Sequence, residues 1–161
     1  DNVEVARLIF PEHYEEAVEN TPARIVETHY HGAGGDYRQC VYHKEIDYEE
    51  YDSLFAKAKA RESVRTLIEI ALARLCFPYR LSEQAREEYT SFLRKCAGDT
   101  ADLLFVRDDM ETVLFLLEHR IWEGESLEEA LDKAQEIGQA EAAALLLSKR
   151  RGTAGKKTFE L

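Results

Sequence analysis

The sequence predicts a mostly α-helical protein built from stacked antiparallel helix pairs, with one β-hairpin inserted around residues 24–46. Two observations predict the helices. Apolar residues recur at helical spacing along most of the chain, and a glycine joins two short helical patterns within residues 126–151. The hairpin is predicted by alternating segments at 24–31 and 38–46, which flank a glycine-rich turn and are rich in residues that favour strands.

The clearest of these patterns is the helix pair predicted from Ser126 to Arg151, around which the rest of the chain is organised. Ser126 and Glu129 have the spacing of a capping box. Gly138 suits the left-handed conformation that ends many helices. The first helix has one apolar face, whereas the Ala- and Leu-rich run over 140–147 is apolar on nearly every side. We therefore expect the second helix to be packed between neighbours.

The other elements follow from the same periodicity and from helix-terminal residues. Helices are expected over residues 1–10, 48–60, 62–76, 82–96 and 109–122, with a short one over 11–20. Asp47 with Glu50 and Asp108 with Glu111 repeat the capping-box spacing, and Gly98 is expected to end the helix before it. A single helical-repeat domain is thus predicted over residues 1–151, with the 24–46 hairpin as an arm and residues 152–161 as a polar tail.

A segment at Arg61 loosely resembles three others, which are alike and begin at Asn2, Asp109 and Gln139. Each of these three has a polar residue, an apolar residue and a Glu ahead of a leucine-rich stretch, and the last two starts are 30 residues apart. Residues 134–141, followed by two leucines at 145 and 146, are similar to the second half of an ankyrin repeat, whose period is about 33 residues.

The resemblance to the ankyrin-repeat family is best over residues 107–151, and it implies a protein-binding scaffold with no intrinsic chemistry. The Thr-Pro-Leu-His turn of that family is absent, and the hairpin around 24–46 lies outside the pattern. An unrelated helical-hairpin fold that uses the same glycine hinge is the alternative.

Charge and composition restrict the classes of partner. The 161 residues carry a formal net charge of −11, which argues against direct binding to nucleic acid and is compatible with a basic protein partner. No apolar run is long enough to span a membrane, and no signal sequence opens the chain. The odd number of cysteines, three, indicates reduced thiols, so we expect a cytoplasmic protein.

The strongest candidate for a metal or catalytic site lies in the hairpin and consists of His29, His31, Cys40 and His43. Tetrahedral zinc requires convergent ligands, but Cys40 and His43 differ in strand parity and cannot both face the two histidines of the other strand. Cys40 beside His43 or His29 lacks the context that activates a nucleophile. We therefore expect no metal, no cofactor and no enzymatic activity.

Tyrosines gather around the same hairpin, and Tyr30, Tyr37 and Tyr42 are candidates for contacts with a partner. Packing of the hairpin onto the helices is the other explanation for them. The sequence thus favours a non-catalytic protein–protein interaction scaffold. An acidic nucleic-acid mimic that blocks the basic groove of a DNA- or RNA-binding protein is the first alternative, and a metal-binding or cysteine-dependent enzyme is the second.

Overall fold

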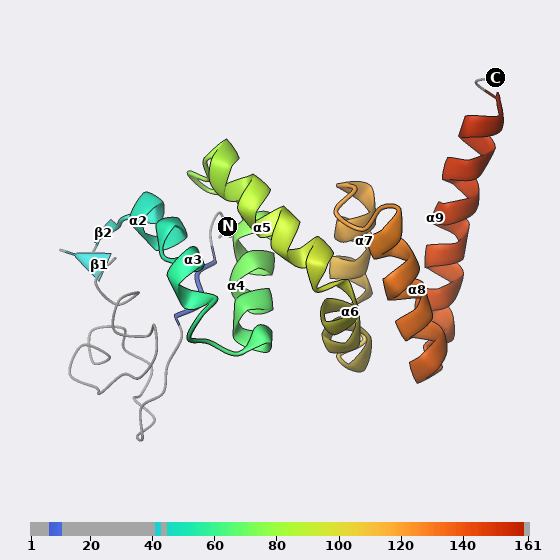
Figure 1. Ribbon diagram of the computed structural model, residues 1–161, viewed down its shortest axis with the longest axis horizontal. Helices are drawn as coiled ribbons and strands as arrows, with labels where there is room; N and C mark the ends of the chain where they lie inside the picture. The colour runs from blue at the N-terminus through green and yellow to red at the C-terminus, as the bar shows by residue number, and fades with distance from the viewer. Residues whose placement is uncertain (1–6, 11–40, 43–44, 160–161) are drawn as a thin grey trace, which may run out of the picture. The chain divides into compact units, whose positions relative to one another are not determined.

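The computed structural model describes the backbone of residues 7–10, 41–42 and 45–159, and the side chains of 7–10 and 47–152. The described chain is mostly helical, as predicted (Figure 1). Its contacts divide it into two compact units, Asp1–Tyr89 and Thr90–Leu161, and the boundary falls inside α5 (Glu83–Lys95). Each unit is described separately below.

The first unit contains α2 (Tyr48–Ser53), α3 (Phe55–Ala58), α4 (Val64–Cys76) and the first half of α5. The helix predicted over 48–60 is therefore interrupted at Leu54. Asp47 and Ser63 cap α2 and α4, because their side-chain oxygens accept hydrogen bonds from the third residue that follows. The core of this unit is apolar and aromatic, and includes Tyr51, Phe55, Leu67, Ile68, Ile70, Leu75 and Tyr89.

Residues 7–10 are neither helix nor strand, so the helix predicted over 1–10 is wrong for these four residues. The backbone N–H and C=O of Ile9 are both hydrogen-bonded to the hydroxyl of Tyr51 in α2. A tertiary contact therefore replaces the helical bonds that the local pattern favours.

The strands described are β1 (Val41–Tyr42) and β2 (Glu45–Ile46), which pair antiparallel with Val41 opposite Ile46. Both lie within residues 38–46, which the sequence predicted as one continuous strand. Because these two short strands pair with each other, that prediction is wrong. Residues 24–40 lie outside the described part of the chain, so the hairpin predicted around 24–46 is not confirmed.

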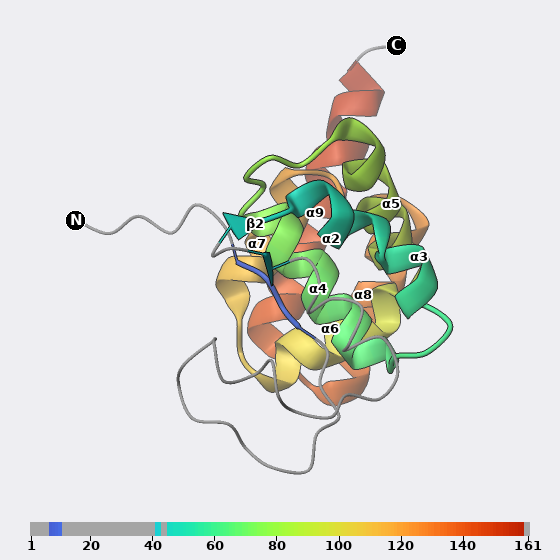
Figure 2. The same ribbon diagram turned by 90° about the vertical axis from the view of Figure 1, so that its left-hand side faces the viewer.

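The second unit contains two helix pairs, α6 (Ala97–Val106) with α7 (Met110–Glu118) and α8 (Glu125–Ile137) with α9 (Ala140–Phe159). Helix α6 packs against α8 and α7 packs against α9, so each helix of one pair contacts its counterpart in the other (Figure 1 and Figure 2). The buried side chains between them include Ala101, Leu104, Phe105, Val113, Leu116, Leu117, Leu127, Ala130, Leu131, Ala134, Ala142 and Leu146.

Three helices of this unit end in the same type of turn. Asp108, Arg120 and Gly138 have φ values of 56°, 58° and 83°. In each case the N–H of the next residue donates, at 2.9 Å, to the carbonyl oxygen five residues earlier. This is the Schellman motif, which satisfies carbonyl groups left free at the end of a helix. The predicted role of Gly138 is confirmed.

The same turns correct two predicted caps. Asp108 occupies the left-handed position after α6, so the N-cap of α7 is Asp109, which accepts a hydrogen bond of 3.1 Å from the N–H of Thr112. Ser126 lies in the first turn of α8, and its hydroxyl accepts a bond from the N–H of Glu123 instead of capping the helix.

Two helix ends also differ from expectation. Gly98 lies inside α6, because the break after α5 falls at Cys96. Helix α9 continues to Phe159, so most of the predicted tail is helical. Ala142 and Leu146 of α9 are fully buried whereas Ala144 is exposed, so α9 is buried on one side only. The prediction that this helix is packed between neighbours is therefore wrong.

Candidate functional site

The residues that the sequence singled out are not tested by the structure. His29, His31, Cys40, His43, Tyr30 and Tyr37 lie outside the described residues, and Tyr42 lies in β1 with its side chain undescribed. Within the described residues, no group of three or more His, Cys, Asp or Glu side chains has the arrangement of a metal site. These seven residues therefore remain predictions.

One face of α8 in the second unit carries a row of exposed acidic side chains. Five exposed carboxylates share it and are called the α8 acidic ridge: Glu125, Glu128, Glu129, Asp132 and Glu136. They lie at positions 125, 128 with 129, 132, and 136, so successive steps of the ridge are three or four residues, or about 4.5–6 Å, apart along the helix axis. The opposite face of α8 is apolar and packs against α6, so burial of Leu127, Ala130, Leu131 and Ala134 fixes the ridge toward solvent.

Only part of the ridge is neutralised by neighbouring cations. Arg150 of α9 contacts Glu128 at 2.9 Å, and Lys133 contacts Glu136 at 3.6 Å. Among the described side chains, Glu125, Glu129 and Asp132 form no ion pair. The centre of the ridge is thus a row of solvated carboxylates on a rigid helix, which is suited to a cationic ligand.

The field of the ridge extends to the start of α6. The pKa of Cys96, at the N-cap of α6, is raised by burial and by the negative charges of Asp99 and Glu129. A raised pKa keeps the thiol protonated, whereas a nucleophilic cysteine needs a lowered one. Cys96 therefore has the properties of a structural cysteine.

The turns at the ends of α6 and α8 are joined by side chains. The amide Nε2 of Gln139 donates a 3.2 Å hydrogen bond to Oδ1 of Asp108. Two exposed apolar side chains flank these turns, Val106 at 73% and Ile137 at 41% exposure. The acidic ridge therefore ends beside an apolar side chain. The feature of the sequence that pointed to these paired turns is the 30-residue interval between them.

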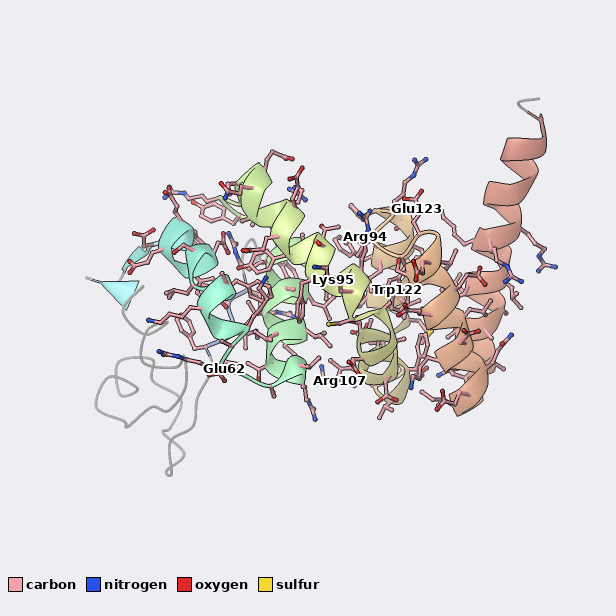
Figure 3. The ribbon with its side chains drawn as sticks, viewed as in Figure 1. Glu62, Arg94, Lys95, Arg107, Trp122 and Glu123 are labelled. Carbon is pink, nitrogen blue, oxygen red and sulfur yellow. The ribbon has the colours of Figure 1, made fainter. Side chains whose placement is uncertain are left out.

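The connection between α7 and α8 is held from α5. Arg94 donates from Nη2 to the carbonyl of Arg120 at 2.9 Å and from Nε to the carbonyl of Ile121 at 3.2 Å. Trp122, labelled with Arg94 in Figure 3, is the next residue and is 1% exposed. Its ring centroid lies 6.0 Å from that of Phe105. These contacts fix the start of α8 and so the base of the ridge.

The described part of the first unit contains a buried polar network. Arg74 is fully buried and makes a two-pronged contact with Asp52, at 2.8 and 2.9 Å, while the hydroxyl of Tyr89 donates to Asp52 at 2.6 Å. Arg74 also donates to the carbonyls of Tyr79 and Arg80.

Burial alone would lower the pKa of Arg74, but its hydrogen bonds and attraction to Asp52 raise it above its ordinary value. The guanidinium therefore stays charged, and its hydrogen bonds are used inside the protein. We assign this network a structural role, which is to tie α2, α4 and α5 together and to hold the turn after α4.

Comparison with known families, curated proteins and solved structures finds no match to this chain. In the part of the chain that the structure describes, no helix is both long enough and apolar enough to cross a membrane.

Proposed function

We propose that this chain is a non-catalytic protein-binding scaffold of the ankyrin-like helical-repeat type, and that its second unit binds a basic protein through the α8 acidic ridge. The observation that carries the proposal is the repeated turn. Asp108 and Gly138 lie 30 residues apart, both adopt a left-handed conformation, and both are followed by the same hydrogen bond to the carbonyl five residues earlier. Two helix pairs that share a turn and pack helix on counterpart are typical of repeat scaffolds.

The charge of the ridge supports a basic partner over an acidic or neutral one. Three of its carboxylates form no ion pair among the described side chains, and the whole chain has a net charge of −11. Complementary charge raises association rates and selects against partners of like charge. Binding through the ridge should therefore weaken as ionic strength rises, because salt screens exposed charges beyond about 10 Å at 0.1 M.

A pair of matched charge reversals tests the proposal. The ridge variant carries Glu129→Lys and Asp132→Lys, and the control carries Glu83→Lys and Glu87→Lys on an exposed face of α5. Each changes the net charge by the same amount. Tagged chains are captured from cells, and bound proteins are quantified by mass spectrometry.

We expect that the unaltered chain and the control capture a basic protein and that the ridge variant does not. A direct titration with that purified protein at two salt concentrations then checks the interaction. If both variants retain the same proteins equally, or if no basic protein is enriched, the ridge is not the binding surface.

The acidic nucleic-acid mimic is a second candidate, and one observation favours retaining it. Asp99 and Asp102 of α6 are exposed one helical turn apart, and Asp99 and Glu129 both act on Cys96. Carboxylates of α6 thus accompany those of α8, although they form a much shorter row. If the captured partner binds labelled duplex DNA or RNA, adding this chain should release the nucleic acid in proportion to its binding. If the partner binds the nucleic acid and this chain at the same time, the mimic function is excluded but the protein-binding function is not.

A further inference from the structure

The first unit holds a short piece of its own chain against its helices. Residues 7–10, which are not helical, run beside α4 in both views (blue in Figure 1 and Figure 2). Three contacts fix the segment, and each uses a different property of it. They involve Arg7, Ile9 and Phe10 on one side, and Tyr51 and Phe77 on the other.

The central contact recognises the backbone. The Tyr51 hydroxyl accepts a hydrogen bond of 2.9 Å from the N–H of Ile9 and donates one to the carbonyl oxygen of the same residue. Neither bond depends on the side chain at position 9. A site of this kind accepts any non-proline residue there, because proline lacks the N–H.

The two outer contacts recognise side chains. The ring of Phe10 packs edge-on against Tyr51, with 5.6 Å between centroids. The guanidinium of Arg7 lies 4.6 Å from the centroid of the Phe77 ring, at the C-terminal end of α4. Aromatic pairs and cation–π contacts each add to the burial of apolar area, because they depend on the charge distribution of the ring. Together they select an arginine three residues before an aromatic residue.

Tyr51 is more deeply buried than the segment of residues 7–10 that lies on it. Tyr51 is fully buried, whereas Leu8, Ile9 and Phe10 are half-buried and Arg7 is exposed. The segment therefore covers Tyr51 from the outside and is not itself part of the core. Its departure would uncover an aromatic surface and a hydroxyl group that is suited to backbone hydrogen bonds.

From this geometry we propose that Tyr51 and Phe77 form a docking site for a peptide segment of the pattern Arg-x-x-aromatic, with any non-proline residue before the aromatic one. The chain's own Arg7–Phe10 occupies the site in cis and competes with a segment of the same pattern from a partner protein. The site lies in the first unit, so it is independent of the ridge on α8.

A competition measurement on the full chain tests this docking site. The probe is a fluorescently labelled peptide with the sequence of residues 5–12, Val-Ala-Arg-Leu-Ile-Phe-Pro-Glu. The opened variant carries Arg7→Ala and Phe10→Ala, which weaken the internal segment and leave the receiving residues unchanged. Because an internal competitor reduces apparent affinity by the fraction of vacant sites, the opened variant should bind the probe at least about tenfold more tightly than the unaltered chain.

Two controls define the expected specificity. A probe with Ile replaced by Pro at position 9 should bind the opened variant several-fold more weakly, and so should the unaltered probe when Tyr51→Phe is added to that variant. Equal binding to the opened and unaltered chains, or no effect of Tyr51→Phe, would overturn the proposal.

A second measurement needs no altered protein. Because the Ile9 amide donates a hydrogen bond to the Tyr51 hydroxyl, its hydrogen exchange in the unaltered chain should be slow. A large excess of the probe should displace the internal segment and accelerate exchange at Ile9, whereas the Pro-containing probe should have a smaller effect. Exchange at Ile9 that does not respond to either peptide would refute the competition.

Discussion

The side-chain amide of Gln139 donates a hydrogen bond to the carboxylate of Asp108, 31 residues earlier in the chain. The two residues lie in successive turns of the second unit, one after α6 and the other before α9. Their bond links the two helix pairs at the point where the 30-residue pattern repeats. Formation of this bond therefore requires that the pair α6–α7 and the pair α8–α9 pack with these two turns side by side.

Removing the hydrogen bond between Asp108 and Gln139 should lower stability only slightly, but the effects of the two substitutions should not be additive. Asp108→Ala and Gln139→Ala are each expected to lower the free energy of unfolding by about 0.5–1.5 kcal/mol, as for an ordinary hydrogen bond at an exposed site. The double variant should lose less than the sum of the two. Urea unfolding of the four proteins measures the coupling. Strict additivity would show that the bond does not form in solution.

The left-handed conformations at Arg120 and Gly138 predict that substitutions at these two positions change the stability in opposite directions. Arg120 is exposed and has φ of 58°, a conformation that costs a side-chain-bearing residue about 1–2 kcal/mol. Arg120→Gly should therefore stabilise the protein by several tenths of a kcal/mol, after the entropy that glycine loses on folding.

Gly138→Ala is the counterpart of this change. No heavy atom lies within 4 Å of the added Cβ, so the expected loss of about 1 kcal/mol comes from the backbone conformation alone. Thermal unfolding of the two variants compares the signs. A stabilising Gly138→Ala would contradict the turn geometry.

Breaking the buried network should have the largest effect. Arg74→Met leaves the carboxylate of Asp52 buried without its cationic partner, and such a loss typically costs about 3–5 kcal/mol. Tyr89→Phe removes only one hydrogen bond to Asp52 and should cost about 1–3 kcal/mol. Denaturant unfolding ranks the two variants. A smaller loss for Arg74→Met than for Tyr89→Phe would exclude the proposed role of the ion pair.

Cys96 should react slowly with alkylating reagents at neutral pH. Burial, Asp99 and Glu129 raise its pKa above the ordinary value of 9.0, so its thiolate fraction is small until the pH exceeds that value. Alkylation with iodoacetamide across pH 7–10, followed by peptide mass spectrometry, measures the midpoint. Glu129→Gln should move the midpoint downward, while Glu87→Gln should leave it unchanged.

The same shift has a consequence for stability. A thiol whose pKa is higher in the folded than in the unfolded state contributes stability that is complete below pH 9.0 and is lost as pH rises through the folded-state pKa. Cys96→Ser should therefore flatten the decline of stability above pH 9. An unchanged decline in that variant would assign the effect to other groups.

Local signals explain how much of the fold was predictable. The helical spacing of α4, α5 and α8 and the glycine after α8 act within a few residues, and the structure confirms them. The N-cap of α7 is Asp109 and not the predicted Asp108, because the conformation of Asp108 is set by the Schellman turn that ends α6. The sequence predicts a helix for residues 7–10 because nothing local indicates that Tyr51 binds their backbone.

By itself, the sequence determined the helical class, the excess of negative charge and the 30-residue interval between two similar turns, since these depend on residue type and spacing along the chain. Only the tertiary structure decided which carboxylates of α8 are paired, that Arg74 is buried against Asp52, and that Tyr51 holds the segment from Arg7 to Phe10. Apart from the local pair of Lys133 with Glu136, these contacts join residues 22 to 42 positions apart, and their energies depend on packing that no local pattern encodes.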